Sequence, residues 1–279
     1  MTEKMATVVG ANGGFGRLFS ENLRSDGWKI AGLDLAEPDP DTNLCDEFSV
    51  VSEGVSNLEA DEFLKASSLV LLCTGSNATF WWIDHCSSLL SAQCLCVDVL
   101  SVKTQVTARA AAAGFEGQYL SLHPMFAPRW GFSGFSVAAI PVQDGPSVTD
   151  FLQMISSWGS RVVQLSPEEH DRAAAVLQGG AHAAVLAFAQ ATTLSGVSPE
   201  TLKAMSTAVS GPIFDLVQRI TAGDPATYHS IQAENPYAQT TRNNLIAALN
   251  DLDGLSAENM AEQFGEMMIK LRHDVQDQK

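Results

Sequence analysis

Ala6-Thr7-Val8-Val9-Gly10-Ala11-Asn12-Gly13-Gly14-Phe15-Gly16 is the stretch that decides the fold of this chain. Its first five residues form a short apolar run that is typical of a buried strand. The glycines that follow permit a tight turn, and a helical pattern with one apolar face then extends from Gly13 to Asp26. A strand, a glycine-rich turn and a helix in this order predict the first unit of a doubly wound α/β domain.

The alternation of strand and helix continues to about residue 166. Strands that alternate with helices predict a mainly parallel sheet covered on both faces, which is a Rossmann-type arrangement. We expect further strands at 29–35, 69–73, 94–97, 119–122, 136–141 and 161–165, and helices at 60–66, 78–90, 102–113 and 148–159.

After residue 166 the pattern becomes entirely helical. Ser166-Pro167-Glu168-Glu169 is a helix start signal, with a capping hydroxyl, a proline in the first turn and acidic residues near the positive helix end. We therefore expect two domains, residues 1–166 and residues 167–279. Asn235-Pro236-Tyr237 predicts a kink or a helix end. The expected helices of the second domain are 168–193, 199–222, 225–234, 240–252 and 257–275.

Composition narrows the class of protein. The chain has 279 residues, of which 46% are hydrophobic, and a formal net charge of −16, which argues against binding to nucleic acid or an anionic membrane. We expect neither a signal peptide nor an apolar run of membrane-spanning length. No C-x-x-C spacing occurs among the cysteines, so we expect reduced thiols in a cytoplasmic protein and no metal site. The five cysteines are Cys45, Cys73, Cys86, Cys94 and Cys96.

The glycine-rich turn predicts a dinucleotide site. Glycines let the backbone approach a pyrophosphate at the N–H groups of the helix start, although their spacing is G-x-x-G-x-x-G instead of G-x-G-x-x-G. Asp34 ends the next strand, where a carboxylate accepts hydrogen bonds from ribose hydroxyls. No basic residue occurs in Leu35-Ala36-Glu37-Pro38, which favours NAD over NADP. The expected cofactor-binding residues are Gly10, Ala11, Asn12, Gly13, Gly14, Phe15, Gly16, Asp34, Thr74 and Ser101.

Two further residues point to chemistry at the same edge of the sheet. Ser101 follows the strand at 94–97, and His123 ends the strand after it. Because parallel strands share one carboxyl edge, both residues should face the cofactor cleft. A neutral imidazole there can take a proton from a hydroxyl while hydride leaves the same carbon, and a serine can orient it. From the residues alone, Ser101 could instead cap a helix and His123 could be an ordinary loop histidine.

Five blocks of the sequence resemble the prephenate and arogenate dehydrogenases, in the family's order from residue 7 to about residue 235. The resemblance implies a homodimer that associates through the helical domain. It also implies NAD-dependent oxidative decarboxylation of a cyclohexadiene. The blocks are Gly10 to Phe19, Asp98 with Ser101-Val102-Lys103, His123-Pro124-Met125-Phe126, Glu169-His170-Asp171-Arg172 with Gln178 and His182, and Arg219-Ile220 with Asp224-Pro225.

The resemblance also implies roles for single residues. His123 would be the base that hydrogen-bonds the ring 4-hydroxyl, Ser101 would orient it, and Arg219 would bind a substrate carboxylate. His182 would be a second histidine of the site, and His182 and Gln178 would contact the substrate, the cofactor or only each other. Because a dianionic substrate must enter an acidic protein, Lys103 and Arg129 are further candidates for substrate binding. Without the resemblance, Arg219 could be a surface residue, His182 a core histidine and His170 part of a helix start.

The loop after His123 departs from the family pattern. Members often have His-Pro-Met-Phe-Gly-Pro, whereas this chain has Ala127 and then Arg129-Trp130-Gly131-Phe132. The loop should line the substrate side, so three substrates remain possible: prephenate, arogenate and 4-amino-4-deoxyprephenate. We expect conversion of prephenate to 4-hydroxyphenylpyruvate, a step of aromatic amino acid biosynthesis. The alternative is the amino analogue, which is used in antibiotic biosynthesis.

Two other hypotheses fit the domain pattern. A β-hydroxyacid dehydrogenase or imine reductase also joins a dinucleotide domain to helices, but it places a catalytic lysine or aspartate on the long helix after the sheet. Here the first lysine after residue 166 is Lys203. A non-catalytic NAD-binding sensor would need the fold without the combination of His123, Ser101 and Arg219.

Overall fold

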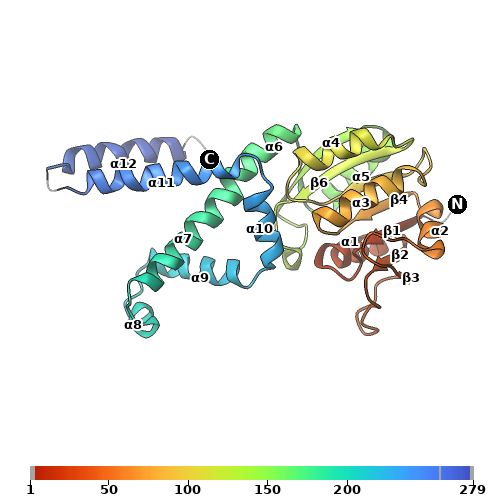
Figure 1. Ribbon diagram of the computed structural model, residues 1–279, viewed down its shortest axis with the longest axis horizontal. Coiled ribbons are helices and arrows are strands. Elements are labelled where there is room, and N and C mark those ends of the chain that lie inside the picture. Colours follow the sequence, from red (N-terminus) through yellow and green to blue (C-terminus); the bar gives the residue numbers. More distant parts are fainter. Residues whose placement is uncertain (1–3, 258, 277–279) are drawn as a thin grey trace. The chain divides into compact units, whose positions relative to one another are not determined.

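The structure is a computed structural model that describes residues 4–257 and 259–276 (Figure 1). The chain separates into two compact units, one ending at Arg172 and one beginning at Ala173.

The first unit is built on an eight-stranded sheet in the order β3-β2-β1-β4-β5-β6-β7-β8. Neighbouring strands are parallel except for β6 and β7, so the predicted mainly parallel sheet is confirmed. The edge strand β3 was not predicted, because its four residues lack an apolar run. The strands are β1 (Met5–Val9), β2 (Lys29–Asp34), β3 (Glu47–Val50), β4 (Leu69–Leu72), β5 (Leu95–Asp98), β6 (Gln118–Pro124), β7 (Ser136–Gln143) and β8 (Arg161–Gln164).

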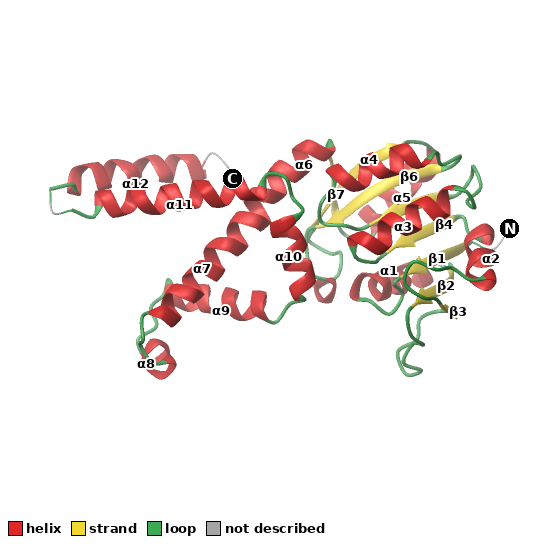
Figure 2. Ribbon diagram, in the orientation of Figure 1, coloured by secondary structure: helices red, strands yellow, loops and turns green. Residues whose placement is uncertain are grey.

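Helices cover both faces of this sheet (Figure 2). One face packs against α1 (Gly14–Ser25) and α5 (Pro146–Ser157), which bury Phe19 and Phe151 among the strand side chains. The other face packs against α2 (Leu58–Ala66), α3 (Ser76–Ser87) and α4 (Thr104–Ala113). Burial of one large apolar side chain contributes about 1.5–3 kcal/mol, so two such layers hold the strands in place.

The carboxyl ends of β1, β4, β5 and β6 lie at the same edge of the sheet, because these neighbouring strands are parallel. The loops that leave this edge carry the glycine-rich turn, Thr74, Ser101 and the residues after His123. The sheet therefore gathers residues that are far apart in the sequence.

A long helical stretch begins at the predicted position. Ser166 and Glu169 cap its start reciprocally, since Glu169 N–H donates to Ser166 Oγ and Ser166 N–H donates to Glu169 Oε2. The stretch comprises α6 (Pro167–Ala174), a π-helical segment η2 (Ala175–Gly180) and α7 (Ala181–Leu194). The sequence predicted this helix, but its periodicity did not predict the π-helical segment.

The second unit consists of helices among its described residues. The break at Asn235–Tyr237 is confirmed, because it separates α10 from α11. The single helix expected at 199–222 is instead two helices, since Thr207 and Ser210 accept hydrogen bonds from each other's backbone N–H and so begin a new helix. The helix expected at 257–275 is observed from Ala261, and residue 258 of the expected range lies outside the described residues. The helices are α8 (Pro199–Ala204), α9 (Ser210–Thr221), α10 (Pro225–Ala233), α11 (Ala238–Leu255) and α12 (Ala261–Gln276).

Close packing holds η2 against α10 and α11. A Cβ at Gly180 would lie 2.8 Å from Cγ2 of Thr241, so any larger residue there would have to displace the Thr241 side chain. Gln232 donates from Nε2 to the Gly179 carbonyl at 2.7 Å, which satisfies a backbone group in the π-helical segment.

The prediction that no apolar run reaches membrane-spanning length was wrong for the long helix after the sheet. Pro167–Leu194 is a continuous helix of 28 residues with a mean hydropathy of 1.2, long and apolar enough by length and composition to cross a membrane. Such a single helix is weak evidence for a membrane span. Its first two turns carry ionisable residues, of which His170 and Asp171 are buried and hydrogen-bonded within the sheet unit, as in a helix of a globular protein.

Candidate active site

The glycine-rich loop has the backbone shape that a dinucleotide needs. Gly10 adopts a φ of +80°, and a Cβ there would lie 2.4 Å from the Cys73 carbonyl oxygen. A Cβ at Gly16 would lie 2.1 Å from the Gly10 carbonyl oxygen, so α1 can begin this close to the turn only with glycine. Gly13 caps α1 without a side-chain hydrogen bond, and the first turn holds no acidic residue. The N–H groups at this helix start therefore fit a pyrophosphate.

Asp34 lies beside this loop at the end of β2. Its carboxylate accepts hydrogen bonds from the backbone N–H groups of Asn12 at 2.8 Å and Leu35 at 2.7 Å, which fix its orientation. Arg17 also flanks the loop, with Nε 3.0 Å from the Asn12 carbonyl and Nη1 2.8 Å from Thr42 Oγ1. The stretch after Asp34 did not reveal this positive charge, because Arg17 reaches the loop from α1.

Thr74 and Ser101 leave the same sheet edge from β4 and β5. Thr74 Oγ1 lies 2.9 Å from Thr79 Oγ1, an interaction that ties the β4 loop to the first turn of α3. Ser101 is half-buried in the turn before α4. Its role in orienting His123 stays a prediction.

His123 lies in β6, where it pairs with Ala138 of β7 and is 2% exposed. Its Nδ1 atom lies 2.9 Å from Nε2 of His170 in α6. The Nδ1 atom of His170 lies 2.8 Å from Oδ1 of Asp171. Two histidines and one carboxylate therefore form a hydrogen-bonded chain that begins at the predicted base.

Asp171 is held by more than its histidine neighbour. It also accepts hydrogen bonds from the backbone N–H groups of Lys103 and Thr104, each at 2.8 Å, and from the Thr104 hydroxyl. Asp171 thus caps the start of α4 from another helix. Burial would raise the pKa of Asp171, but the hydrogen bonds from His170, Thr104 and Lys103 outweigh it and lower the pKa.

The ammonium group of Lys103 is turned into the protein interior. It is fully buried, and its Nζ atom lies 2.8 Å from both Asp98 Oδ1 and Ser121 Oγ. The second Asp98 oxygen accepts a hydrogen bond from the Tyr119 hydroxyl at 3.0 Å. Burial lowers the pKa of Lys103, although Asp98 opposes this shift. These contacts suit a group that joins β5 and β6 to α4 better than one that binds a substrate.

The same surroundings determine the charge of His123. Burial lowers its pKa well below 6.5, and a positive charge on His170 or on Lys103 lowers it further. His123 is therefore a neutral imidazole at physiological pH, the form that can accept a proton.

The loop that follows His123 rests on the glycine-rich loop. A Cβ at Gly14 would lie 2.8 Å from Cγ of Pro128, which begins a short 3₁₀ helix, η1 (Pro128–Trp130). Phe126 packs edge-on against Phe15, with ring centroids 6.1 Å apart. The Arg129 guanidinium lies over the Trp130 ring, which is 49% exposed. The loop that departs from the family pattern thus contacts the expected cofactor loop.

Three predicted substrate residues belong to the second unit. Gln178 lies in the π-helical segment, and such segments are frequent at functional sites. His182 packs against the Tyr228 ring at a centroid distance of 4.8 Å, and its Nδ1 atom has no hydrogen-bond partner among the described residues. Burial lowers the pKa of His182. Arg219 is exposed in the last turn of α9. Their substrate roles stay predictions.

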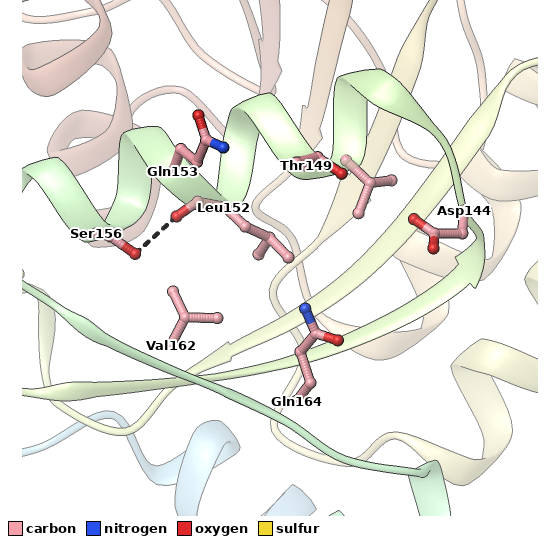
Figure 3. A pocket seen from close by; sticks show the side chains of 8 residues that line it. Asp144, Thr149, Leu152, Gln153, Ser156, Val162 and Gln164 are labelled. Atoms are coloured by element: carbon pink, nitrogen blue, oxygen red, sulfur yellow. Dashed lines mark hydrogen bonds between the residues drawn. The ribbon is translucent and has the colours of Figure 1, made fainter.

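A separate groove of about 600 Å³ lies between α5 and β8 (Figure 3). Leu152, Ser156, Val162 and Gln164 are among its lining residues, and it holds none of the predicted site residues. The groove is therefore outside the candidate active site.

His170 and Asp171 lie in a block that resembles the family, but neither was a predicted site residue, and His170 was interpreted from the residues alone as part of a helix start. The sequence signal for a role of Asp171 was indirect. Lys103 is the residue before α4, and it has no side chain that caps a helix start, so an acceptor must come from elsewhere in the fold. An adjacent histidine and aspartate at the start of the long helix could have supplied it.

Comparison with known proteins identifies the family. Residues 166–270 match the family model described as prephenate dehydrogenase, dimerization domain. The chain is 32% identical over 267 residues to 4-amino-4-deoxyprephenate dehydrogenase of Streptomyces pristinaespiralis, which covers 95% of this chain and 89% of that protein. It is 28% identical over 226 residues to the T-protein of Enterobacter agglomerans, covering 80% of this chain and 55% of that protein.

Solved structures share the fold. Prephenate dehydrogenase from Aquifex aeolicus in complex with hydroxyphenyl propionate and NAD+ superimposes with a TM-score of 0.75 at 21% sequence identity, over 99% of each chain. A Rossmann-type sheet with a glycine-rich loop, followed by a helical domain, is the fold of this class of dehydrogenases, and the relatives named above place the chain in that class. The chain belongs to the prephenate dehydrogenase family. This membership decides against the β-hydroxyacid dehydrogenase and imine reductase hypotheses.

Proposed function

We propose that this protein catalyses the NAD-dependent oxidative decarboxylation of a prephenate-type cyclohexadiene, with His123 as the base. The observation that carries the proposal is the buried, neutral His123 at the sheet edge that also presents the glycine-rich loop. A neutral imidazole at that edge can take a proton from the substituent on the ring carbon that loses hydride.

Residues of this chain supply three functions in the proposed reaction. The N–H groups at the start of α1 hold the pyrophosphate and Asp34 holds the ribose. NAD, when bound, accepts the hydride that leaves C4. His123 removes the proton from the C4 substituent, and the C1–carboxylate bond breaks so that its electron pair enters the ring and carbon dioxide leaves. Positioning and one base are sufficient, because the product ring is aromatic.

A substrate with two carboxylates needs local cations in a chain of net charge −16. We assign this role to Arg219, whose planar guanidinium can bind a carboxylate with two hydrogen bonds, and to Arg129 in the loop after His123. Arg219→Ala should raise the KM for the cyclohexadiene about tenfold or more and change kcat less. An unchanged KM would remove Arg219 from the substrate site.

The similarity to a named relative supports 4-amino-4-deoxyprephenate as the substrate over prephenate, which was the expectation from the sequence. The relative that matches 95% of this chain is named for 4-amino-4-deoxyprephenate. With an ammonium at C4, His123 must remove one proton before hydride can leave, and that proton is released because the product is a neutral arylamine. With a hydroxyl at C4, the proton that His123 removes returns to the oxygen of the aromatic product, so the overall reaction releases none. Prephenate and arogenate remain the alternatives.

The test is turnover of each of the three cyclohexadienes with NAD, followed by the absorbance of the reduced cofactor and by proton release in weak buffer. We expect preference for the amino compound and one proton per turnover. Preference for prephenate with no proton release would support the alternative. Failure with all three would reject the proposed activity.

The catalytic role of His123 has its own test. His123→Asn should lower kcat by roughly 10²–10⁴-fold and leave NAD affinity near that of the unmodified protein, because the base contributes only to the reaction. Loss of NAD binding would show that His123 has a structural role instead.

Cofactor preference is tested by titration with NADH and NADPH. We expect tighter binding of NADH, because Asp34 would repel a 2′-phosphate and Arg17 is already bonded to Asn12 and Thr42.

We also propose that the protein is a homodimer and that it lies in the cytoplasm. The five cysteines of the chain are free thiols, which fits a reducing compartment.

A further inference from the structure

The hydrogen-bonded chain from Asp171 through His170 to His123 has a direction. Asp171 accepts hydrogen bonds from the backbone N–H groups of Lys103 and Thr104, from the Thr104 hydroxyl and from His170. These donors around a fully buried carboxylate at the start of α4 keep it ionised. An ionised carboxylate cannot donate, so Nδ1 of His170 carries the proton of this hydrogen bond.

The state of the second ring follows from the first. In the neutral form of His170, with its proton on Nδ1, Nε2 holds a lone pair. That lone pair faces Nδ1 of His123 at 2.9 Å, so Nδ1 of His123 must carry a proton and donate it. In a neutral ring the remaining lone pair of His123 is then on Nε2.

We propose that His170 and Asp171 are positioning residues that fix His123 in the tautomer protonated on Nδ1, so that Nε2 is the atom that accepts the substrate proton. The catalytic meaning of this assignment rests on the proposed function, whereas the tautomer itself does not. Neither residue needs to touch the substrate.

The hydrogen bonds from His123 through His170 to Asp171 also stabilise the product of proton transfer. When the substrate proton reaches Nε2 of His123, the ring becomes a buried cation with the Lys103 ammonium and His170 as neighbours. Its Nδ1–H hydrogen bond to His170, and that of His170 to Asp171, connects the new charge to a buried anion. In this proton transfer the O–H or N–H bond of the substrate breaks and an Nε2–H bond forms on His123, while the Nδ1–H groups of His123 and His170 keep their protons.

The matched variants are His170→Gln and His170→Leu. The Gln carbonyl oxygen can take the place of Nε2 and accept from His123, whereas Leu has a similar volume and no acceptor. We expect His170→Leu to lower kcat by about 10- to 100-fold with the KM within about twofold, and His170→Gln to recover most of that loss. Equal losses in both variants would overturn the proposal.

His85 provides the control pair. It is the other histidine bonded to a carboxylate in the sheet unit, with Nε2 2.7 Å from Asp61 Oδ1, and it belongs to α3. His85→Gln and His85→Leu should leave kcat unchanged. If His85→Leu lowered kcat as much as His170→Leu, the effect would come from general loss of packing and the proposal would fail.

The decisive measurement does not need a substrate. Long-range ¹H–¹⁵N correlation spectra report which ring nitrogen of each histidine carries a proton, and the chain has six histidines to assign. We expect both His123 and His170 to be neutral and protonated on Nδ1 at pH 7.5, and His123 to lose this preference in His170→Leu. A His123 protonated on Nε2, or a cationic His170, would overturn the proposal. Correct tautomers in a protein that turns over no cyclohexadiene would reject the proposed function and leave the positioning pair intact.

Discussion

At the scale of single residues, the environment of His123 determines what it can do. An exposed imidazole titrates near 6.5, whereas His123 is buried beside the Lys103 ammonium and His170, so its pKa lies well below that value. Burial is the largest cause of this shift, and the two residues that add to it, His170 in α6 and Lys103 just before α4, are about 47 and 20 positions away in the sequence. The chemical role of a histidine at a strand end thus depends on elements that the local sequence does not specify.

The depressed pKa of His123 has a consequence for pH dependence. Between its folded pKa and 6.5 the unfolded chain binds a proton that the folded protein does not, so His123 contributes stability that is lost as the pH falls through this window. As a base it should stay active through 6.5. We expect the acidic limb of kcat/KM to lie below 6.5, with His170, Lys103 and Asp171 as the ionisable groups that influence it.

The measurement is a pH–rate profile at saturating NAD, with enzyme returned to pH 7.5 after each exposure to separate titration from unfolding. A limb centred at 6.5 or above would contradict the burial of His123. An acidic limb must still be present in the profile, because a protonated His123 cannot accept a proton from the substrate.

At the scale of elements, the site depends on how α4 and α6 meet the ends of β5 and β6. Asp171 caps α4, and the buried Lys103 connects Asp98 of β5 with Ser121 of β6. The glycine-rich loop likewise meets the loop after His123 through Gly14 and Pro128. These contacts connect the expected cofactor and base segments.

Lys103→Met should destabilise the protein by about 3–5 kcal/mol, because it leaves the Asp98 carboxylate buried without its cation. Urea denaturation measures this as a lower midpoint with an unchanged m-value. The control is Arg109→Met, which breaks the exposed ion pair with Asp84 and should have a much smaller effect. Similar effects for both variants would show that the buried pair is not a major contributor.

Gly14→Ala should affect the substrate loop more than the cofactor. Its Cβ would lie 2.8 Å from Cγ of Pro128, so η1 must move, and we expect a several-fold higher KM for the cyclohexadiene with a smaller change in NAD affinity. Gly16→Ala should instead weaken NAD binding, because its Cβ meets the Gly10 backbone. Gly254→Ala, where a Cβ meets nothing within 4 Å, is the control. The opposite pattern for Gly14 and Gly16 would contradict this assignment.

At the scale of the whole molecule, the second unit exposes many large apolar side chains. Burying them against a second copy would remove apolar area from water, and the family model that matches residues 166–270 is a dimerization domain. In Figure 1, α11 and α12 lie side by side and supply several of these residues. Those exposed on the two helices are Ile246, Leu249, Leu252, Phe264, Met268, Ile269 and Leu271.

We expect a dimer in sedimentation experiments, and we expect the double variant Ile246→Glu with Leu249→Glu to be a monomer, since charges would be buried without partners. Both side chains are about 60% exposed in the single chain (58% and 61%). Leu58→Glu is the control, because Leu58 is 85% exposed on α2 of the sheet unit. A dimeric double variant would exclude this part of α11 from the interface.

Local patterns predicted much of the fold, for physical reasons that particular segments illustrate. The apolar strand before Gly10 and the Ser166 cap specify their own structure through backbone sterics and neighbouring hydrogen bonds. The edge strand β3 was missed because pairing with β2, and not its own apolar content, makes it a strand. The π-helical segment at Ala175–Gly180 was missed because its geometry depends on α10 and α11.

The sequence by itself determined the Rossmann-type sheet, the glycine-rich loop, the strand-end position of His123 and the start of the long helix, since each depends on residues close together in the chain. Only the tertiary structure decided that His170, itself bonded to Asp171, bonds to His123 and that Lys103 faces the interior. Both results depend on contacts between residues far apart in the sequence. Burial strengthens such contacts and sets their protonation, and no local pattern encodes it.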